Sequence, residues 1–350
     1  MKIKIASNKF IGEKEPVFII AEVGINHNGN VRIAKKMVSE AKKCGADAVK
    51  FQTFRAEEFV GDKKLIYKYR SGGKTVKESM YGMFKRHEFT EGQYRDIFNF
   101  ARRVGIIPFS TPSDTQSADL LIDRLGVRLI KIASDDMYNL DLLKYIAKKG
   151  LPIIISTGMA TLEEIKESFN LIKKEKNNKI IILHCVSLYP TPEELVNLNR
   201  MVSIKNIFKC MVGFSDHSDG NEAALASVCL GAKVIEKHFT LDKNMSGPDH
   251  RFSADPLELE NLVNSVRKIE KMIGDGLFDI SKEEMKIRRS FRRSIVAAHF
   301  IKKGEKIKNS MLAFRRPGSG HPPKSKALLI GRIASKNIKE GELLIIDRNI

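Results

Sequence analysis

The sequence predicts a (β/α)8 barrel followed by a small C-terminal domain. Its 350 residues exceed one ordinary domain but accommodate a barrel of about 250 residues with an appendage. Eight short β-branched runs precede residue 240, with helix-like stretches between most of them, and such an alternation indicates a closed barrel of parallel strands covered by helices. The runs are VFIIAE (17–22), ADAVKFQ (46–52), IIPFST (106–111), RLIKIAS (128–134), LPIIIST (151–157), KIIILHC (179–185), CMVGFS (210–215) and AKVIEKHF (232–239).

The segments between the runs have the apolar spacing of amphipathic helices. VRIAKKMVSEAKKCG (31–45) ends in glycine, a common helix stop. In TLEEIKESFNLIKKEK (161–176), Thr161 precedes Glu164 by three residues, which predicts a capping box. ADPLELENLVNSVRKIEKMIG (254–274) follows the eighth run, and we expect it to close the barrel.

Three stretches depart from this alternation. Residues 55–90 form a long mixed polar and aromatic insertion after the second run, which we interpret as a lid or subunit contact. Residues 274–292 resemble a linker. After Arg293 the pattern becomes short strands broken by the turns KKGE (302–305) and KEGE (339–342), which resemble each other weakly and indicate a separate domain.

The formal net charge is +19, and the lysines that produce it are spread along the chain. This distribution indicates solvated helix faces and a field that attracts anionic substrates. No basic stripe is interleaved with aromatics, so we expect no nucleic-acid partner, although charge alone keeps that alternative open. The sequence shows no membrane span or signal peptide, and its four cysteines lack metal or disulfide spacing. We therefore expect a cytoplasmic protein with buried free thiols.

Polar side chains stand at the end of every predicted strand, where barrel enzymes carry their active sites. Lys50 and Lys131 supply positive charge, and nearby hydroxyls supply hydrogen-bond donors, so together they are suited to a phosphate or carboxylate. These hydroxyls belong to Thr111, Ser134, Ser156 and Ser215.

Two histidines follow neighbouring predicted strands at the same level. His217 and His238 are suited to a divalent transition metal, with water or a carboxylate completing the site. His27, His184 and His250 are competing candidates, and any one histidine could instead be a satisfied core residue.

The same residues lie in motifs that resemble the sialic acid synthase family, which includes N-acetylneuraminate, legionaminate, pseudaminate and spore-coat sugar synthases. The motifs run in order along nearly the whole chain. They are AEVGINHNGN (21–30), GADAVKFQTF (45–54), FSTPSD (109–114), KIAS (131–134), ISTGMAT (155–161), LHCVSLYPTP (183–192), GFSDHS (213–218), GAKVIEKHFTLDKNMSGPDH (231–250) and RRPGSG (315–320).

The resemblance implies a TIM barrel over 1–275, a linker over 276–292 and a C-terminal SAF (antifreeze-like) domain over 293–350. It implies a transferase that condenses phosphoenolpyruvate with an N-acylated amino sugar, such as N-acetylmannosamine, to give a nonulosonic acid and phosphate. It also implies a divalent metal, Mn²⁺ before Mg²⁺ or Co²⁺, and a domain-swapped homodimer in which each SAF domain caps the partner's barrel.

The resemblance assigns roles to individual positions. His217 and His238 bind the metal, while Glu22, Lys131 and Asp136 take part in catalysis. Phosphoenolpyruvate is held by Lys50, Thr111, Lys131, Ser134, Ser156, Ser187 and Ser215. The sugar is contacted by Gln52, Tyr189, Asp249 and Arg316, the last of which comes from the partner subunit.

The chain departs from the family pattern at two places that bear on the acceptor sugar. Ser134-Asp135-Asp136 replaces a Ser-Gly-Glu run, so either aspartate can substitute for the usual glutamate. Ser187 replaces an asparagine of the neuraminate branch. The alternatives are a pseudaminate or spore-coat type of synthase with another acceptor, or a non-catalytic relative that binds an anion or carbohydrate.

Overall fold

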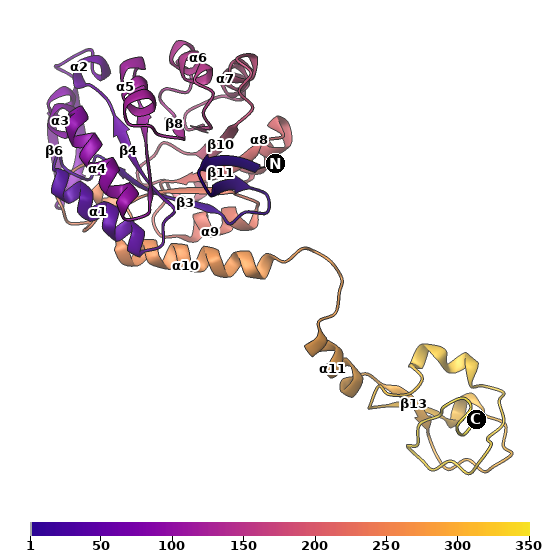
Figure 1. Cartoon of the computed structure of the whole chain (residues 1–350). Coiled ribbons are helices and arrows are strands. Elements are labelled where there is room, and N and C mark those ends of the chain that lie inside the picture. The colour runs from indigo at the N-terminus through magenta and orange to yellow at the C-terminus, as the bar shows by residue number, and fades with distance from the viewer. Residues whose placement is uncertain (1) are drawn as a thin grey trace. The chain divides into compact units, whose positions relative to one another are not determined.

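A computed structural model describes residues 2–350, which form two compact units, one ending at Gly274 and the other running over Asp275–Ile350. The first unit is built on an eight-stranded parallel sheet with helices around its outside (Figure 1). Its strands are β3 (Phe18–Gly24), β4 (Ala48–Thr53), β7 (Ile107–Pro112), β8 (Ile130–Ile132), β9 (Ile153–Ser156), β10 (Ile180–Cys185), β11 (Met211–Asp216) and β12 (Val234–His238).

The strands follow one another around the sheet in chain order, and β12 pairs with β3. Strands β7 and β8 stand at the two ends of the hydrogen-bonded strand order, and they also contact each other. The sheet is therefore curved into a barrel. The predicted (β/α)8 fold is confirmed, with each of the eight runs supplying one strand.

Helices on the outer face bury the outward side chains of the strands. They are α1 (Val31–Lys43), α4 (Glu91–Arg103), α5 (Thr115–Asp119), α6 (Leu140–Lys148), α7 (Leu162–Lys174), α8 (Asn199–Phe208), α9 (Glu222–Cys229) and α10 (Pro256–Ile273). The predicted capping box opens α7, because the Glu164 amide donates to Thr161 Oγ1 at 3.3 Å and the Thr161 amide donates to Glu164 Oε2 at 2.7 Å. These bonds satisfy two amides that the first turn leaves free.

The barrel interior changes character from one end to the other. Alternate residues of a strand face the same side, so Phe18 and Ile20 of β3 point inward with Glu22. The lower inward positions form an apolar cluster that also contains Ile3, Ile5 and Ile11 from a hairpin of β1 (Lys2–Ala6) and β2 (Lys9–Gly12). The hairpin therefore packs at the amino ends of the strands and leaves the carboxyl ends for polar groups.

The insertion after β4 has its own secondary structure. It contains α2 (Ala56–Phe59), a hairpin of β5 (Ile66–Ser71) and β6 (Lys74–Ser79), and α3 (Met80–His87). A small apolar cluster of Ile25, Phe54 and Met83 anchors it to the barrel.

In the second unit, β13 (Ser294–Ala297) pairs with β14 (Leu312–Arg315). Most other residues of this unit lie in turns and isolated bridges. The stretch that resembles a linker contains a helix, α11 (Lys282–Phe291), begun by Ser281 as N-cap. The two similar turns have the same internal bond: the Lys302 amide donates to Glu305 Oε2 at 3.0 Å, and the Lys339 amide to Glu342 Oε2 at 3.1 Å.

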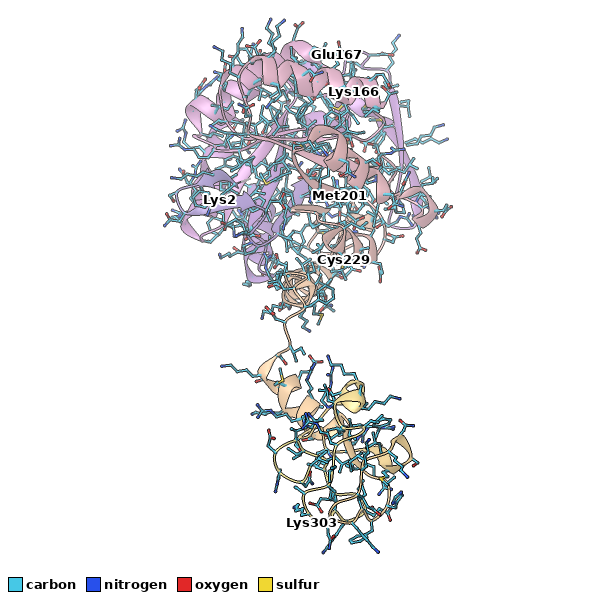
Figure 2. All side chains as sticks on the ribbon, turned by 90° about the vertical axis from the view of Figure 1, so that its right-hand side faces the viewer. Lys2, Lys166, Glu167, Met201, Cys229 and Lys303 are labelled. Atoms are coloured by element: carbon cyan, nitrogen blue, oxygen red, sulfur yellow. The ribbon has the colours of Figure 1, made fainter. Side chains whose placement is uncertain are left out.

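Charged side chains of both units point into solvent, as Lys166 and Glu167 of α7 and Lys303 show (Figure 2). The high net charge is thus spread over exposed surface. All four cysteines are free, and three are buried, but Cys229 is exposed at the end of α9, contrary to the sequence expectation. Among residues 2–350, no helix is both long and apolar enough to cross a bilayer.

Candidate active site

The carboxyl ends of the barrel strands surround a pocket of about 340 Å³. Every barrel residue to which the resemblance assigned a role lines it except Asp249. The competing candidates His27, His184 and His250 do not line it. Those that line it are Glu22, Lys50, Gln52, Thr111, Lys131, Ser134, Asp136, Ser156, Ser187, Tyr189, Ser215, His217 and His238.

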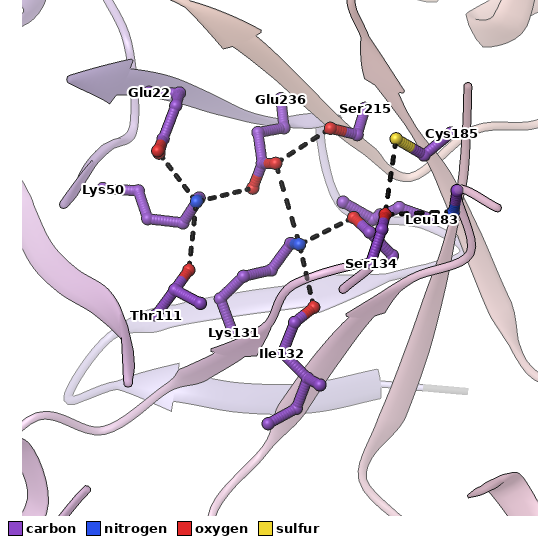
Figure 3. A network of polar contacts seen from close by, with 12 residues as sticks. Glu22, Lys50, Thr111, Lys131, Ile132, Ser134, Leu183, Cys185, Ser215 and Glu236 are labelled. Atoms are coloured by element: carbon purple, nitrogen blue, oxygen red, sulfur yellow. Dashed lines mark hydrogen bonds and ion pairs between the residues drawn. The ribbon is translucent and has the colours of Figure 1, made fainter. Parts of the chain in front are cut away.

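Lysines and glutamates alternate across the pocket floor (Figure 3). Lys50 Nζ lies 2.8 Å from Glu22 Oε2 and 3.8 Å from Glu236 Oε2, and it donates to Thr111 Oγ1 at 3.1 Å. All four side chains are at most 6% exposed. Buried charges persist where they are paired in this way, so the floor is a stable polar network.

Lys131 occupies the other side of Glu236. Its ammonium group lies 3.8 Å from Glu236 Oε1 and donates to Ser156 Oγ at 2.6 Å and to the Ile132 carbonyl at 3.0 Å. Ser215 Oγ donates to Glu236 Oε1 at 2.9 Å. Glu236 therefore joins the two lysines, and an incoming anion would meet both cations with their hydroxyl partners.

Burial and neighbouring charge shift the protonation of this floor. Burial raises the pKa of Glu22, and the nearby carboxylate of Glu236 adds to the effect, although Lys50 opposes it. Burial lowers the pKa of Lys131, and Lys50 contributes in the same direction. Glu22 is thus suited to hold a proton beside an anion.

The predicted metal-binding histidines stand at the carboxyl ends of adjacent strands, His217 directly after β11 and His238 as the last residue of β12, with their ring centroids 5.4 Å apart. His217 Nδ1 lies 2.8 Å from the Val186 carbonyl, which requires Nδ1 to carry a proton and leaves Nε2 as the nitrogen available to a metal. His238 Nδ1 is buried without a hydrogen-bond partner, and Asp249 Oδ2 is 3.9 Å away. Burial lowers the pKa of His238 well below its usual range, and His217 adds to this effect.

Burial lowers the pKa of His217, but the neighbouring Cys185 outweighs this effect and the net shift is upward. A ring nitrogen binds a divalent cation once it has lost its proton, so this pair fits such an ion, with His217 releasing a proton on binding. Within residues 2–350, however, no third His, Cys, Asp or Glu gathers with them into a ready cage. The pair alone would therefore leave the remaining coordination positions to water or substrate.

A buried ion pair lies behind the histidines. Lys237 Nζ is 2.8 Å from Asp216 Oδ2 and donates to the carbonyls of Ser218 at 2.6 Å and Gly220 at 2.8 Å. Asp216 Oδ1 accepts from the amide of Ser218 at 2.9 Å and from its hydroxyl at 2.6 Å. These contacts hold the turn that carries His217.

Ser134 and Ser187 lie on either side of a glycine. The Gly158 amide donates to Ser134 Oγ at 3.0 Å. A Cβ atom at position 158 would lie 2.2 Å from Ser187 Oγ and 2.8 Å from Ser134 Oγ, so no larger residue fits without displacing them. Cys185 Sγ accepts from Ser134 Oγ at 3.7 Å, so Cys185 lies on the same side of the pocket as Ser134.

The two aspartates of the fourth strand end both reach the pocket mouth. Asp135 is exposed, whereas Asp136 is half-buried. Burial raises the pKa of Asp136 to about 6, and the negative charge of the neighbouring Asp135 adds to this effect. Asp136 can therefore exchange a proton near neutral pH.

The remaining expected sugar contacts are more scattered. Gln52 Nε2 donates to Glu22 Oε1 at 3.3 Å, and the Tyr189 ring lies 4.2 Å from that of His217. Asp249 lies outside the pocket lining, beside His238. Arg316 belongs to the second unit, where its exposed guanidinium lies 4.7 Å from the Phe291 ring centroid.

Several pocket residues were not selected from the sequence. Glu236 is the most central of them, and a signal for it exists, because it precedes His238 by two and so shares its face of the strand. Cys185 follows from the same alternation in β10. Phe54, directly after β4, and the insertion residues Phe59 and Phe84 also line the pocket, but nothing in the local pattern distinguishes them from other aromatics.

A closed barrel with a charged pocket at the carboxyl ends of its strands defines the architecture of a (β/α)8-barrel enzyme. This chain belongs to the NeuB family, whose sequence model matches residues 37–277. The SAF domain matches residues 292–348, which confirms the small C-terminal domain expected from the resemblance.

Relatives match over nearly their full lengths. The N,N'-diacetyllegionaminic acid synthase of Campylobacter jejuni is 44% identical, over 93% of this chain and 98% of its own. Human N-acetylneuraminate-9-phosphate synthase is 35% identical, over 99% and 96%. The solved N-acetylneuraminic acid (sialic acid) synthetase of Leptospira borgpetersenii is 36% identical, with a TM-score of 0.74 over 83% of this chain and 97% of that one.

Proposed function

We propose that this protein condenses phosphoenolpyruvate with the open-chain form of an N-acylated amino sugar, giving a nonulosonic acid and phosphate. The observation that carries the proposal is the juxtaposition of two buried lysines, with their hydroxyl partners, and two histidines with free ring nitrogens. Synthases of sialic-type acids among the relatives support the reaction class.

The pocket floor is the binding site for phosphoenolpyruvate in this proposal. Lys50 and Lys131 supply the positive charge, and Thr111, Ser156 and Ser215 supply donors. Ser134 and Ser187 add two further hydroxyls at the side of the pocket. Charged donors fixed by a surrounding network need little reorganisation when an anion binds, which favours catalysis by preorganisation.

His217 and His238 would hold a divalent metal, and we propose Mn²⁺ before Mg²⁺ or Co²⁺. Such an ion, when bound, supplies Lewis-acid polarisation of the sugar aldehyde. Gln52, Tyr189 and Asp249 would bind the sugar so that its aldehyde carbon faces the enol carbon.

The reaction forms one carbon–carbon bond and breaks one carbon–oxygen bond. The enol carbon bonds to the aldehyde carbon, water adds at C2, and phosphate leaves from the tetrahedral centre that results. The attacking water loses two protons, one as it bonds to C2 and one as the C2 hydroxyl becomes the ketone and phosphate leaves. The aldehyde oxygen gains one of them, and the departing phosphate takes up the other. Glu22 and Asp136 would carry these protons, because the pKa of each carboxyl is raised by burial.

Arg316 would reach the acyl group of the sugar from a partner subunit in a domain-swapped homodimer. The exposure of its guanidinium in the SAF unit supports this assignment.

The test is phosphate release from phosphoenolpyruvate by the purified full-length protein with Mn²⁺ and a panel of N-acylated hexosamines. We expect release that requires an acceptor, together with a product whose mass equals that of the nine-carbon acid. The matched control is Lys131→Met, which should abolish release. No release with any acceptor, or release that is unchanged in the control variant, would disprove the function.

A further inference from the structure

The loop that follows β12 carries Asp249 and has almost no regular secondary structure. One 3-10 turn, His250–Phe252, precedes its return to the barrel. The two ends of the loop are joined beside β12, where the Thr240 amide donates to the Ala254 carbonyl at 2.9 Å and the Ala254 amide donates to the His238 carbonyl at 2.7 Å. Between these ends, the position of Asp249 depends on contacts made by side chains.

Asn26 belongs to the motif AEVGINHNGN, two residues after the end of β3, and its side chain crosses to this loop. Asn26 Nδ2 donates to the Phe239 carbonyl and to Ser253 Oγ, both at 2.9 Å. The Ser253 hydroxyl donates in turn to the Asp249 carbonyl at 2.6 Å. Asn26 and Ser253 are both buried. A chain of two hydrogen bonds therefore connects the segment after β3 to the main chain of Asp249.

These contacts require an amide at position 26. A hydroxyl has one proton, and Ser253 gives that proton to the Asp249 carbonyl, so Ser253 Oγ acts as an acceptor toward Asn26. The Phe239 carbonyl is also an acceptor. The two protons of an asparagine Nδ2 serve both acceptors, whereas an ionised aspartate of the same shape has no proton to donate.

The asparagine also carries a cost. Its Oδ1 atom is buried without a hydrogen-bond partner among residues 2–350. A buried acceptor left unpaired in this way destabilises a fold. The two bonds that Nδ2 donates to the loop give a reason for an amide at this position in spite of that cost.

Asp249 lies where a small displacement of its main chain matters. Its Oδ2 atom is 3.9 Å from His238 Nδ1, and its side chain is only 18% exposed. In the proposed function, the carboxylate of Asp249 binds the sugar while His238 holds the metal. A displacement of about 1 Å in groups that orient a substrate can cost about 100-fold in rate.

We propose that Asn26 is a positioning residue for the reaction. Through Ser253 it fixes the main chain of Asp249, and thereby the carboxylate that binds the acceptor sugar. Asn26 does not line the pocket, so it acts on the sugar through Asp249 and not by direct contact. This inference rests on the proposed function and adds to it a residue that acts from outside the pocket.

The experiment measures phosphate release by the full-length protein with Mn²⁺, varying phosphoenolpyruvate and the sugar in turn. The sugar is the N-acylated hexosamine that the wild type turns over fastest, with N-acetylmannosamine tried first. Asn26→Asp keeps the shape of the side chain but removes both donors. We expect it to raise the KM for the sugar by about 10- to 100-fold and to leave the KM for phosphoenolpyruvate within about 2-fold of the wild type.

Two further variants connect the effect to the hydrogen-bond chain. Ser253→Ala deletes a single oxygen atom, so it breaks the chain even if Asn26→Asp does not fold, and it should raise the sugar KM in the same way. Asn177→Asp is the matched control. Asn177 is also a buried asparagine, and its Nδ2 donates to the Leu151 carbonyl at 2.8 Å, but it lies outside the pocket lining. It should change neither KM.

Hydrogen–deuterium exchange provides a measurement that does not depend on turnover. Peptides that cover residues 240–253 should exchange faster in Ser253→Ala than in the wild type, because the loop has lost a tether. Asn177→Asp should leave the exchange of these peptides unchanged.

The outcomes separate this inference from the function on which it rests. An unchanged sugar KM in Ser253→Ala overturns the positioning role of Asn26 and leaves the condensation reaction standing. The role is also overturned if the KM values for both substrates rise equally, or if Asn177→Asp shows the same rise for the sugar. Absence of phosphate release by the wild type with every acceptor removes both.

Discussion

The ammonium group of Lys237 lies 2.8 Å from Asp216 Oδ2, and this buried pair joins the two strand ends that carry His217 and His238. Asp216 and Lys237 are register partners on β11 and β12. Each immediately precedes one of the histidines, so its side chain faces the opposite side of the strand. The ion pair thus supports the metal-site candidate from behind.

Lys237→Met should destabilise the fold by about 3–5 kcal/mol, because it leaves the carboxylate of Asp216 buried and unpaired. It should also weaken Mn²⁺ binding by about 10-fold or more through loss of ligand positioning. Urea unfolding and Mn²⁺ titration measure the two effects. Lys243→Met is the control, since its pair with Glu258 is over a third exposed and should cost less than about 1 kcal/mol. Equal losses in both variants would refute the role of the buried pair.

His217→Ala and His238→Ala should each abolish turnover and reduce Mn²⁺ affinity by about 100-fold, because each removes one of two ring ligands. His299→Ala, at an exposed position of the second unit, should change neither quantity. Isothermal titration with Mn²⁺ and phosphate release provide the measurements. Full activity in the presence of a strong chelator would exclude the metal role.

Gly158→Ala should raise the KM for phosphoenolpyruvate by about 10-fold, because the added Cβ must displace the hydroxyls of Ser134 and Ser187 by an ångström or so. Gly61→Ala serves as control, since a Cβ there meets nothing within 4 Å. Steady-state kinetics with phosphoenolpyruvate as the varied substrate measure the change. An unaltered KM would show that these hydroxyls do not contact the substrate.

Stability should fall as the pH drops below about 6.5. Burial lowers the pKa of His27 to about 3 and that of His250 to about 4, and the positive charge of a protonated His87 adds to both effects. Each histidine takes up its proton more readily when unfolded. Its stabilising contribution is therefore complete above pH 6.5 and is lost toward pH 4 or 3, at about 1.4 kcal/mol per pH unit.

Urea unfolding midpoints at pH 7, 6 and 5 test this dependence. His250→Gln should make the loss of stability with falling pH shallower than in the wild type. His299→Gln, at an exposed position, should leave the slope unchanged. Parallel slopes for all three proteins would contradict the expectation.

Arg316→Ala should raise the KM for the sugar more than that for phosphoenolpyruvate. The complementation test uses a sugar concentration far below the raised KM, at which Arg316→Ala alone gives no measurable turnover. If Arg316 acts in the partner's barrel, equal amounts of Arg316→Ala and Lys131→Met proteins should, after subunit exchange, recover about a quarter of the wild-type activity at that concentration. Half of the dimers then contain one complete site. No recovery after verified exchange would argue against the domain-swapped arrangement.

Much of the site could be predicted because two general rules apply: side chains alternate along a strand, and the parallel strands of a barrel end at the same edge. Lys50, Lys131, Ser156 and Ser215 occupy inward positions near the ends of their strands, and parallel strands bring such ends together. Glu236 obeys the same rule, but its pairing with both lysines depends on side chains from three strands and so is invisible in any one segment.

Other features escaped the sequence because no local pattern encodes them. The helix α11 lies in a stretch that resembles a linker, since its apolar residues are exposed and give no buried face. Phe54 and Phe84 pack against each other although 29 residues separate them in the sequence. This contact depends on how the insertion after β4 folds back onto the barrel.

By itself, the sequence determined the barrel, the small second domain and the identity of the polar groups at the strand ends, because these follow from periodicity and from the shared direction of parallel strands. Only the tertiary structure decided how those groups interact. It set Glu236 between Lys50 and Lys131, placed the Lys237–Asp216 pair behind the histidines, and brought three phenylalanine rings to the pocket. Each of these contacts joins side chains from separate elements, which come within contact distance only when the chain has folded into the barrel.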